Sequence, residues 1–334
     1  MQKSTLKTTY SKTFGDTGDD SANPWARAGK KNEKNEKKGG SWATGKKAST
    51  DIASAKHENP PWLKAISSLA TEKGREAEGL FLAEGMRVVS EIAEYHRDLV
   101  QGIYVDETFD NEVLRKKIRE AGLRIHALNP FQMKQVSAVV SGQGIFAVCR
   151  LANEKPNYDT AHTITLVDAV QDPGNLGSLF RNAVGFGVNG IILGRGTVDP
   201  FNPKVVRGSS GCFLRMPFEA GIDLQERFSL LRQKGFCIVA TSPYAKKCIT
   251  ELNPHQSKKI ALLIGNEGSG TNKQVSDLAD EWVKIPMGNS LESLNVAVAH
   301  GILCYQIAQM RSVGDTIIKS RSLLYRSQVL ICAQ

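Results

Sequence analysis

Hydrophobic positions follow regular patterns from residue 59 onward. Up to residue 150, the apolar runs GLFLAEG, VQGIYVDE, LRIHAL and GIFAVCR predict strands. Between them, PWLKAISSLATEKG, EGMRVVSEIAEY and NEVLRKKIREAG have the periodicity of helices. Strands that alternate with helices indicate a parallel or mixed sheet. Residues 59–150 are therefore expected to form a small α/β domain.

A second patterned region covers residues 161–312, with longer elements. Strands are predicted at TITLVDAV, VNGIILG, CFLRMPF, FCIVATS, KIALLIG and DEWVKIPM, and helices at PGNLGSLFRNAVGFG and ESLNVAVAHGILCYQIAQM. On the last helix Leu294, Val298, Ile302 and Tyr305 share one face, which is typical of a core or a subunit contact. The polar stretch 151–160 between the two regions predicts a linker.

The two ends of the chain lack such patterns. Residues 1–58 are polar, Gly-rich and charged, and they predict a disordered basic tail. The first 50 residues hold 11 Lys and Arg against 5 Asp and Glu, so they carry +6 of the total net charge of +9. Such an arm favours contact with nucleic acid, and a solvated tail without a partner is the alternative. Residues 313–334 form a C-terminal tail of uncertain structure.

Several function classes are disfavoured by composition. No window of about 18 apolar residues exists, so no membrane span is expected. The six cysteines are scattered singly, without a CxxC pair or a zinc-type spacing with histidine, which predicts reduced thiols and no metal. The acidic GDTGDD and the single arginine of the tail argue against a transit peptide. A cytoplasmic protein is therefore expected, with organelle targeting as the alternative.

Three glycine-marked loops carry the candidate chemistry: DPGNLGSLFRNA (172–183), GNEGSG (265–270) and IPMGNSLESLNVAVA (285–299). Each lies between a predicted strand and the next helix or loop, where open α/β sheets bind ligands. Their glycine spacing is neither G-x-G-x-x-G nor that of a phosphate loop, which argues against a nicotinamide-dependent enzyme. They contain no His or Cys, which argues against an acyl-transfer nucleophile and against a metal.

In this order and spacing, the three loops resemble the three motifs of the SpoU branch of the SPOUT methyltransferases. These are RNA ribose 2′-O-methyltransferases that use S-adenosyl-L-methionine (AdoMet). The resemblance covers 161–311, and 75–150 resemble the family's small N-terminal substrate-binding domain. It implies an α/β fold class, with an L30e-like N-terminal domain and a SPOUT domain that holds a C-terminal trefoil knot. It also implies a homodimer whose site lies near the subunit interface.

The resemblance implies roles for individual residues. Arg181 matches the central arginine, which would clamp an RNA phosphate and place a positive charge beside the 2′-oxygen. Asn175 would orient substrate or loop, with an ordinary helix N-cap as its other role. Glu267 would orient the site or handle a proton. Ser293 would cap the last helix while its hydroxyl faces the pocket, and Asn295 would help to hold the site together.

Backbone groups are expected to contribute most of the cofactor contacts, because a loop of N–H and C=O groups can read the edges of adenine. Apolar side chains would cover the faces of the ring. The positions that the resemblance assigns to the cofactor, or to its neighbourhood, are Thr241, Gly265, Asn266, Gly268, Ile285, Met287 and Leu294.

The expected substrate is ribosomal RNA, with transfer RNA as the alternative. The separate N-terminal domain favours ribosomal RNA. A non-catalytic RNA-binding or assembly protein on the same scaffold is the competing interpretation. Such a protein would be expected to have lost Arg181 or Asn295, and both are present.

Overall fold

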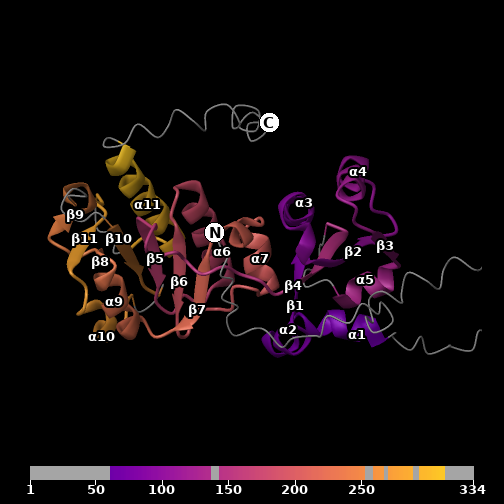
Figure 1. Ribbon diagram of the computed structural model, residues 1–334, viewed down its shortest axis with the longest axis horizontal. Helices are drawn as coiled ribbons and strands as arrows, with labels where there is room; N and C mark the ends of the chain where they lie inside the picture. Colours follow the sequence, from indigo (N-terminus) through magenta and orange to yellow (C-terminus); the bar gives the residue numbers. More distant parts are fainter. Residues whose placement is uncertain (1–60, 137–142, 253–258, 267–269, 289–292, 313–334) are drawn as a thin grey trace, which may run out of the picture. The chain divides into compact units, whose positions relative to one another are not determined.

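The computed structural model describes residues 61–136, 143–252, 259–266, 270–288 and 293–312 (Figure 1). The chain divides into two compact units, Met1–Ala152 and Asn153–Gln334. Both predicted tails, 1–58 and 313–334, lie outside the described residues, as do Glu267 and Gly268. None of the helices described is long and apolar enough to cross a membrane.

The N-terminal unit is a small α/β domain, as its sequence pattern predicts. Its elements are α1 (Pro61–Ser68), α2 (Glu72–Glu78), β1 (Leu80–Glu84), α3 (Met86–Tyr95), the short 3-10 helix η2 (Arg97–Leu99), β2 (Val100–Asp106), α4 (Glu112–Glu120), β3 (Ile125–Leu128), α5 (Pro130–Val136) and β4 (Ile145–Arg150). The strand order is β1-β4-β2-β3. Only β2 and β3 run parallel among the described pairs, so the sheet is mixed.

Successive side chains of these strands point to opposite faces of the sheet, so that both faces carry apolar residues. Leu80 and Leu82 of β1 face a cluster that includes Leu63 and Ile66 of α1, while the odd positions of β1 point to the opposite side. The segment predicted as one helix at the start of this unit is two helices. Thr71 caps the second through the N–H of Gly74, and Gly79 ends it in the left-handed conformation.

The C-terminal unit is a larger α/β domain. Its elements are β5 (Thr163–Val167), α6 (Pro173–Gly185), β6 (Gly190–Gly194), α7 (Pro203–Gly208), α8 (Cys212–Arg215), β7 (Phe218–Ile222), α9 (Leu224–Gln233), β8 (Phe236–Thr241), β9 (Lys247–Cys248), η3 (Ile249–Glu251), β10 (Lys259–Ile264), α10 (Lys273–Ser276), β11 (Glu281–Lys284) and α11 (Val296–Ser312). The strands form one sheet in the order β7-β6-β5-β10-β8-β11-β9, and every pair is parallel.

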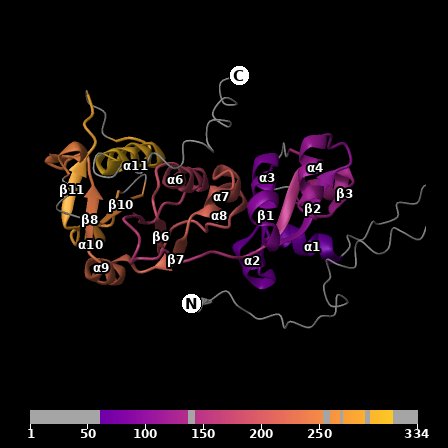
Figure 2. The same ribbon diagram turned by 45° about the horizontal axis from the view of Figure 1, so that its top comes forward.

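Helices cover both faces of this parallel sheet, as is usual for such sheets. Figure 2 shows α6 and α11 on one side and α9 with α10 on the other. On the α9 side, Ile164 and Leu166 of β5 pack with Phe228 of α9 and Val275 of α10. The intervening Thr165 points to the opposite side, where it meets α11.

One predicted strand is wrong in part. CFLRMPF was expected to be extended, but its first residues form α8, and β7 begins at Phe218. Gly211 precedes α8 in the left-handed conformation, and Phe213 and Phe218 both place their rings against Phe180 of α6. The apolar residues of this segment are therefore buried through a turn rather than through a pleated strand.

The stretch between the predicted domains is fastened to the C-terminal unit from Asn153 onward. The Asn153 side chain donates to the carbonyl of Phe218, and the N–H of Phe218 donates to the carbonyl of Glu154. Farther on, Tyr158 donates to the carboxylate of Glu219. Burial, followed by the hydrogen bond to Glu219, raises the pKa of Tyr158, so this hydroxyl keeps its proton. These contacts place residues 153–158 against the edge strand β7.

Candidate cofactor cleft and catalytic groove

A cleft of about 770 Å³ opens at the carboxyl ends of the central strands. The loops that follow β8, β10 and β11 line it, together with the first turns of α11. Six residues predicted to contact or neighbour the cofactor lie in this lining: Thr241, Gly265, Asn266, Ile285, Met287 and Leu294. All six are half-buried, so each combines a fixed position with access from solvent. The structure therefore brings together every predicted cofactor residue that it describes.

The two described ends of the glycine motif after β10 lie close together. Asn266 and Gly270 exchange backbone hydrogen bonds of 2.9 and 3.0 Å, and the Asn266 side chain donates to the carbonyl of Ala169 over 2.7 Å. A Cβ at Gly265 would lie 2.2 Å from the Thr271 nitrogen, closer than any real contact. A glycine is therefore required at this position by the close return of the backbone, before any ligand contact is considered.

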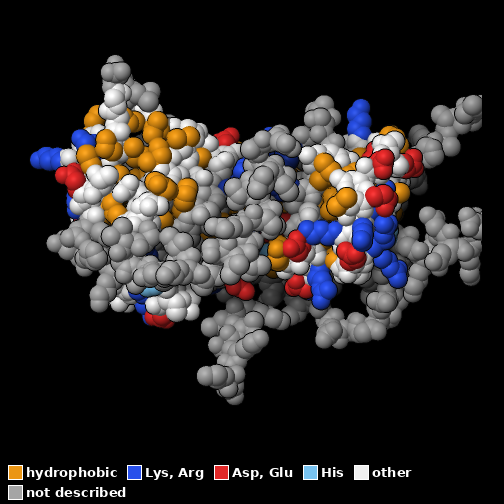
Figure 3. All heavy atoms as spheres, turned by 90° about the horizontal axis from the view of Figure 1, so that it is seen from above, with side chains coloured by type: hydrophobic (Ala, Val, Ile, Leu, Met, Phe, Trp, Pro, Cys, Tyr) orange, Lys and Arg blue, Asp and Glu red, His pale blue; other side chains and the backbone are white. Residues whose placement is uncertain are grey.

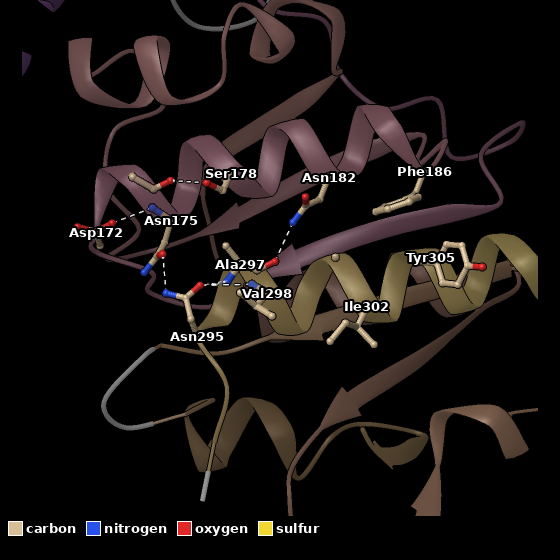
Figure 4. A pocket seen from close by; sticks show the side chains of 12 residues that line it. Asp172, Asn175, Ser178, Asn182, Phe186, Asn295, Ala297, Val298, Ile302 and Tyr305 are labelled. Atoms are coloured by element: carbon tan, nitrogen blue, oxygen red, sulfur yellow. Dashed lines mark hydrogen bonds between the residues drawn. The ribbon is translucent and has the colours of Figure 1, made fainter. Parts of the chain in front are cut away.

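A second cavity, of about 750 Å³, lies between α6 and α11 (Figure 4). We call it the groove. At one end, the Asn295 side-chain amide donates to Oδ1 of Asn175 over 3.0 Å. Two residues from the first and third motifs, 120 positions apart, are thus joined directly. The segment 293–296 separates the groove from the cleft, because Leu294 and Val296 line the cleft while Asn295 lines the groove.

The structure corrects two predicted helix caps. Asp172, rather than Asn175, caps α6, because its carboxylate accepts from the N–H of Asn175 over 2.7 Å. Asn295, rather than Ser293, caps α11, because its Oδ1 accepts from the N–H of Ala297 over 2.9 Å. Ser293 is exposed and lines the cleft. Both polar atoms of the Asn295 side chain therefore form hydrogen bonds: Oδ1 caps α11, and Nδ2 donates to Asn175 on α6.

Asn182 adds a second tie between the two helices, one that sequence reasoning missed. Its side-chain amide donates to the carbonyl of Ala297 over 2.7 Å, as Figure 4 shows. Gly301 faces it, and a Cβ there would come within 3.2 Å of the Asn182 nitrogen. The helices therefore approach closely at this point.

Arg181 projects from the same helix into solvent. Its side chain is exposed, and it makes no ion pair or hydrogen bond with any residue that the structure describes. It precedes Asn182, whose amide is fixed on α11, so its backbone position is defined while its guanidinium stays available. A guanidinium in this state can form a bidentate contact with a phosphate without breaking a contact within the described protein.

The apolar face of the last helix is not the core. Val298, Ile302 and Tyr305 are 52%, 39% and 50% exposed, and Leu294 precedes the helix and lines the cleft. Phe186 of the α6 end meets Tyr305 edge to face, with ring centroids 5.9 Å apart. Figure 4 shows these side chains along the groove, and Figure 3 shows hydrophobic side chains gathered on this side of the C-terminal unit.

Behind the cleft lies a buried polar cluster that the sequence patterns did not reveal. His300 is fully buried, and its Nε2 lies 3.0 Å from Oγ1 of Thr165 and 3.1 Å from Sγ of Cys304. Burial lowers the pKa of His300 to about 3, so the imidazole is neutral at physiological pH. Its neighbours Ala299 and Leu303 line the cleft, so this cluster fixes the helix that forms one wall.

Two family models match the chain. The SpoU rRNA methylase family matches residues 162–305, and the MRM3-like substrate binding domain matches residues 60–147. The 23S rRNA (guanosine(2553)-2′-O)-methyltransferase RlmP of Bacillus subtilis is 33% identical over 256 residues, which are 77% of this chain and 98% of that protein. This chain belongs to the SpoU rRNA methylase family.

Solved structures of methyltransferases share the fold. The AdoMet complex of the SpoU methyltransferase AviRb from Streptomyces viridochromogenes superposes with a TM-score of 0.67 at 23% identity, over 76% of this chain and all of that one. An AdoMet-bound rRNA methyltransferase from Sinorhizobium meliloti is 25% identical, with a TM-score of 0.63, over 75% of this chain and 95% of that one. The α/β fold class expected from the sequence is therefore confirmed, with a parallel sheet in the C-terminal unit.

The groups at the site can be described by their chemistry. No group of three or more His, Cys, Asp or Glu side chains that could hold a metal occurs in the described part of the chain. The side chains that meet between α6 and α11 are amides, hydroxyls and one carboxylate, together with apolar groups. Such groups orient and bind, and they do not supply a strong nucleophile.

Proposed function

We propose that this SpoU family protein transfers a methyl group from AdoMet to a ribose 2′-hydroxyl of ribosomal RNA. The observation that carries the proposal is the convergence of the three motif loops. The second and third motifs, 265–270 and 285–299, both line the cleft. The hydrogen bond between Asn175 and Asn295 joins the first motif, 172–183, to the third at the adjoining groove. Membership of a family whose relative RlmP is named as a 23S rRNA 2′-O-methyltransferase supports both the reaction and the substrate class.

The cleft fits AdoMet in size and chemistry. Its volume of about 770 Å³ falls in the range of about 300–1,000 Å³ that is usual for small-molecule sites. Ile264, Leu294 and Leu303 give it apolar walls, and the backbone of Gly265, Asn266, Gly270 and Thr271 gives it polar groups. We infer that these residues hold the cofactor, with adenine against the apolar walls. When bound, AdoMet supplies a methyl group that its sulfonium has already activated.

The chain itself must position and polarise a weakly acidic hydroxyl. We propose that Arg181 clamps an RNA phosphate next to the target ribose and places its fixed charge near the 2′-oxygen. A guanidinium stays protonated, so it acts here by charge and geometry. Asn175 and Asn295, tied to each other, hold α6 at a fixed position relative to the cleft wall. Glu267 and Ser293 remain proposed members of the same site.

The test of this function uses purified protein, labelled AdoMet, and separate pools of unmodified rRNA and tRNA. Digestion and mass spectrometry identify the methylated nucleosides. A 2′-O-methyl nucleoside from the rRNA pool is the expected result. The same nucleoside from the tRNA pool would move the substrate to tRNA. A base-methylated product would refute the role of Arg181, and cofactor binding without transfer to either pool would favour the scaffold interpretation.

Arg181 is tested by two substitutions. Arg181→Ala should abolish methyl transfer, while the Kd for AdoMet stays within about twofold, because the side chain does not line the cleft. Arg181→Lys is the matched variant that keeps the charge and loses the planar fork, so an intermediate rate is expected. Turnover by the alanine variant at the wild-type rate would remove Arg181 from the reaction.

We further propose that the protein is a homodimer and that the groove face is its interface. Phe186, Val298, Ile302 and Tyr305 expose apolar surface side by side, which favours a protein partner. Ile302→Asp should then yield monomers in sedimentation velocity at concentrations where the wild type is dimeric. A wild-type monomer would refute this proposal.

The trefoil knot implied by the family is likewise a proposal. It is supported by the return of residues 293–303 to the cleft formed by the loops after β8 and β10. Tracing the backbone from β11 to α11 in a crystal structure tests whether this segment passes through a loop of the chain. A path that runs around the loop would overturn the knot.

A further inference from the structure

Tyr244 is the most exposed aromatic side chain in the described part of the molecule, and it lies on the rim of the cleft. Its side chain is 87% exposed, whereas the next aromatic residues, Tyr95 and Phe131, are each 58% exposed. The functional residues assigned above do not include it. An exposed aromatic ring in the lining of a cleft offers its π-face to whatever enters that cleft.

The turn that carries Tyr244 is held firmly. The N–H of Ser242 donates to the carbonyl of Val283 over 3.0 Å, which anchors the turn on β11. The N–H of Tyr244 donates to Oγ of Ser242, and the N–H of Ala245 to the Ser242 carbonyl, both over 3.2 Å. Ala245 is buried, and Lys247 returns the chain to β11. The ring therefore projects from an ordered backbone.

Two lysines accompany Tyr244, one on the same turn and one in the lining of the cleft. Lys246 is exposed two residues later and makes no ion pair with any described residue. Lys284 lines the cleft on the neighbouring strand, also without a described ion-pair partner. An exposed π-face at a cleft that also carries lysines matches a nucleotide, whose base stacks and whose phosphate is anionic.

We propose that Tyr244 is a stacking platform for an RNA base beside the methylated ribose. This inference rests on the proposed function, since it assumes that RNA enters the cleft. The side chain stands at the outer rim, while Ile264, Leu294 and Leu303 form enclosed apolar walls suited to the adenine of the cofactor. An unpaired base drawn out of its stack would regain a stacking partner on this ring, which would hold its ribose at the cleft.

The test compares three substitutions of Tyr244, which should all fold because the side chain is exposed. Tyr244→Phe keeps the ring, Tyr244→Leu keeps apolar bulk without a π-face, and Tyr244→Ala removes both. The probes are the unmodified rRNA transcripts for turnover and S-adenosylhomocysteine for cofactor-site affinity by calorimetry. Base–aromatic stacking predicts that KM for RNA rises between about 5-fold and 150-fold in the Leu and Ala variants. The Phe variant should stay within about twofold of wild type.

The outcomes separate the possibilities. A KM for RNA that is unchanged in the Leu and Ala variants of an active enzyme overturns the platform and leaves the proposed function intact. A Kd for S-adenosylhomocysteine that rises as much as the KM also overturns it, because the ring would then cover the cofactor. A wild type that methylates no RNA overturns the proposed function and this inference together. Photo-crosslinking of 5-iodouridine transcripts to Tyr244 would support the stacked geometry directly.

Discussion

The buried histidine behind the cleft gives the protein a predictable acid sensitivity. His300 is neutral in the folded state, with a pKa near 3, whereas a histidine in the unfolded chain titrates near its ordinary value of about 6.5. Between these two values the unfolded state binds a proton that the folded state does not. The contribution of His300 to stability is therefore complete above about pH 6.5 and is lost as the pH falls toward 3.

The loss of folding stability can be calculated from the interval between the folded and unfolded pKa values of His300. Each pH unit below the unfolded pKa costs about 1.4 kcal/mol, so about 2 kcal/mol should be lost between pH 7 and pH 5. Thr165 and Cys304 touch the imidazole without offering a charge, and burial raises the pKa of Cys304 to about 12. No described contact therefore offsets the cost of protonating the ring.

The assay is urea unfolding at a series of pH values, for the wild type and for His300→Gln. Glutamine keeps a hydrogen-bonding group near Thr165 and does not titrate. Every other group titrates alike in the two proteins, so the difference between their free energies of unfolding isolates the histidine. From pH 7 to pH 5, the wild type should lose about 2 kcal/mol of unfolding free energy relative to the glutamine variant. A difference that is flat across this range would refute the assignment of a neutral buried imidazole.

Three further predictions concern the loops and helices of the site. Gly265→Ala should abolish AdoMet binding, because its Cβ would overlap loop backbone at 2.2 Å, whereas Gly288→Ala, with nothing within 4 Å, should bind normally in calorimetry. Gly177→Ala should lower the free energy of unfolding by about 1–3 kcal/mol, because its Cβ would lie 2.8 Å from the backbone of α7, and Gly185→Ala should not. Asn295→Ala should lower kcat more than it changes AdoMet affinity, and should cost about 1 kcal/mol of stability through the lost cap.

The sequence predicted most elements because their apolar periods were clear, but it could not decide which face of the last helix is buried. The stripe through Val298, Ile302 and Tyr305 has a helical period, and so does the stripe through His300, Leu303 and Ile307. The second is the buried one, although it contains a histidine. A helix that is apolar on two faces carries no signal for the one that meets the sheet.

The sequence was also a poor guide to which single residue caps each helix. Asp172 stands directly before Pro173, a strong start signal, yet the family motif drew attention to Asn175 three positions later. The side chain of Asn175 does not cap the helix, and its Oδ1 accepts a hydrogen bond from Asn295. A residue that is well suited to capping is released for another role when a better cap precedes it. The motifs identified both Asn175 and Asn295 as residues of the site, and the position of the cap explains how Asn175 is able to accept from Asn295.

Strand order explains what the motifs could not reveal. Along the chain, β8 precedes β10, but in the sheet β8 lies between β10 and β11. Since all these strands are parallel, the turn after β8 must reach the same edge as the second and third motifs, directly between them. That turn lies outside the three glycine-marked motifs. The resemblance to the family assigned Thr241 at its start to the cofactor site but gave no role to Tyr244. The central place of this turn in the sheet nonetheless puts Tyr244 on the rim of the cleft, where an incoming RNA would meet it.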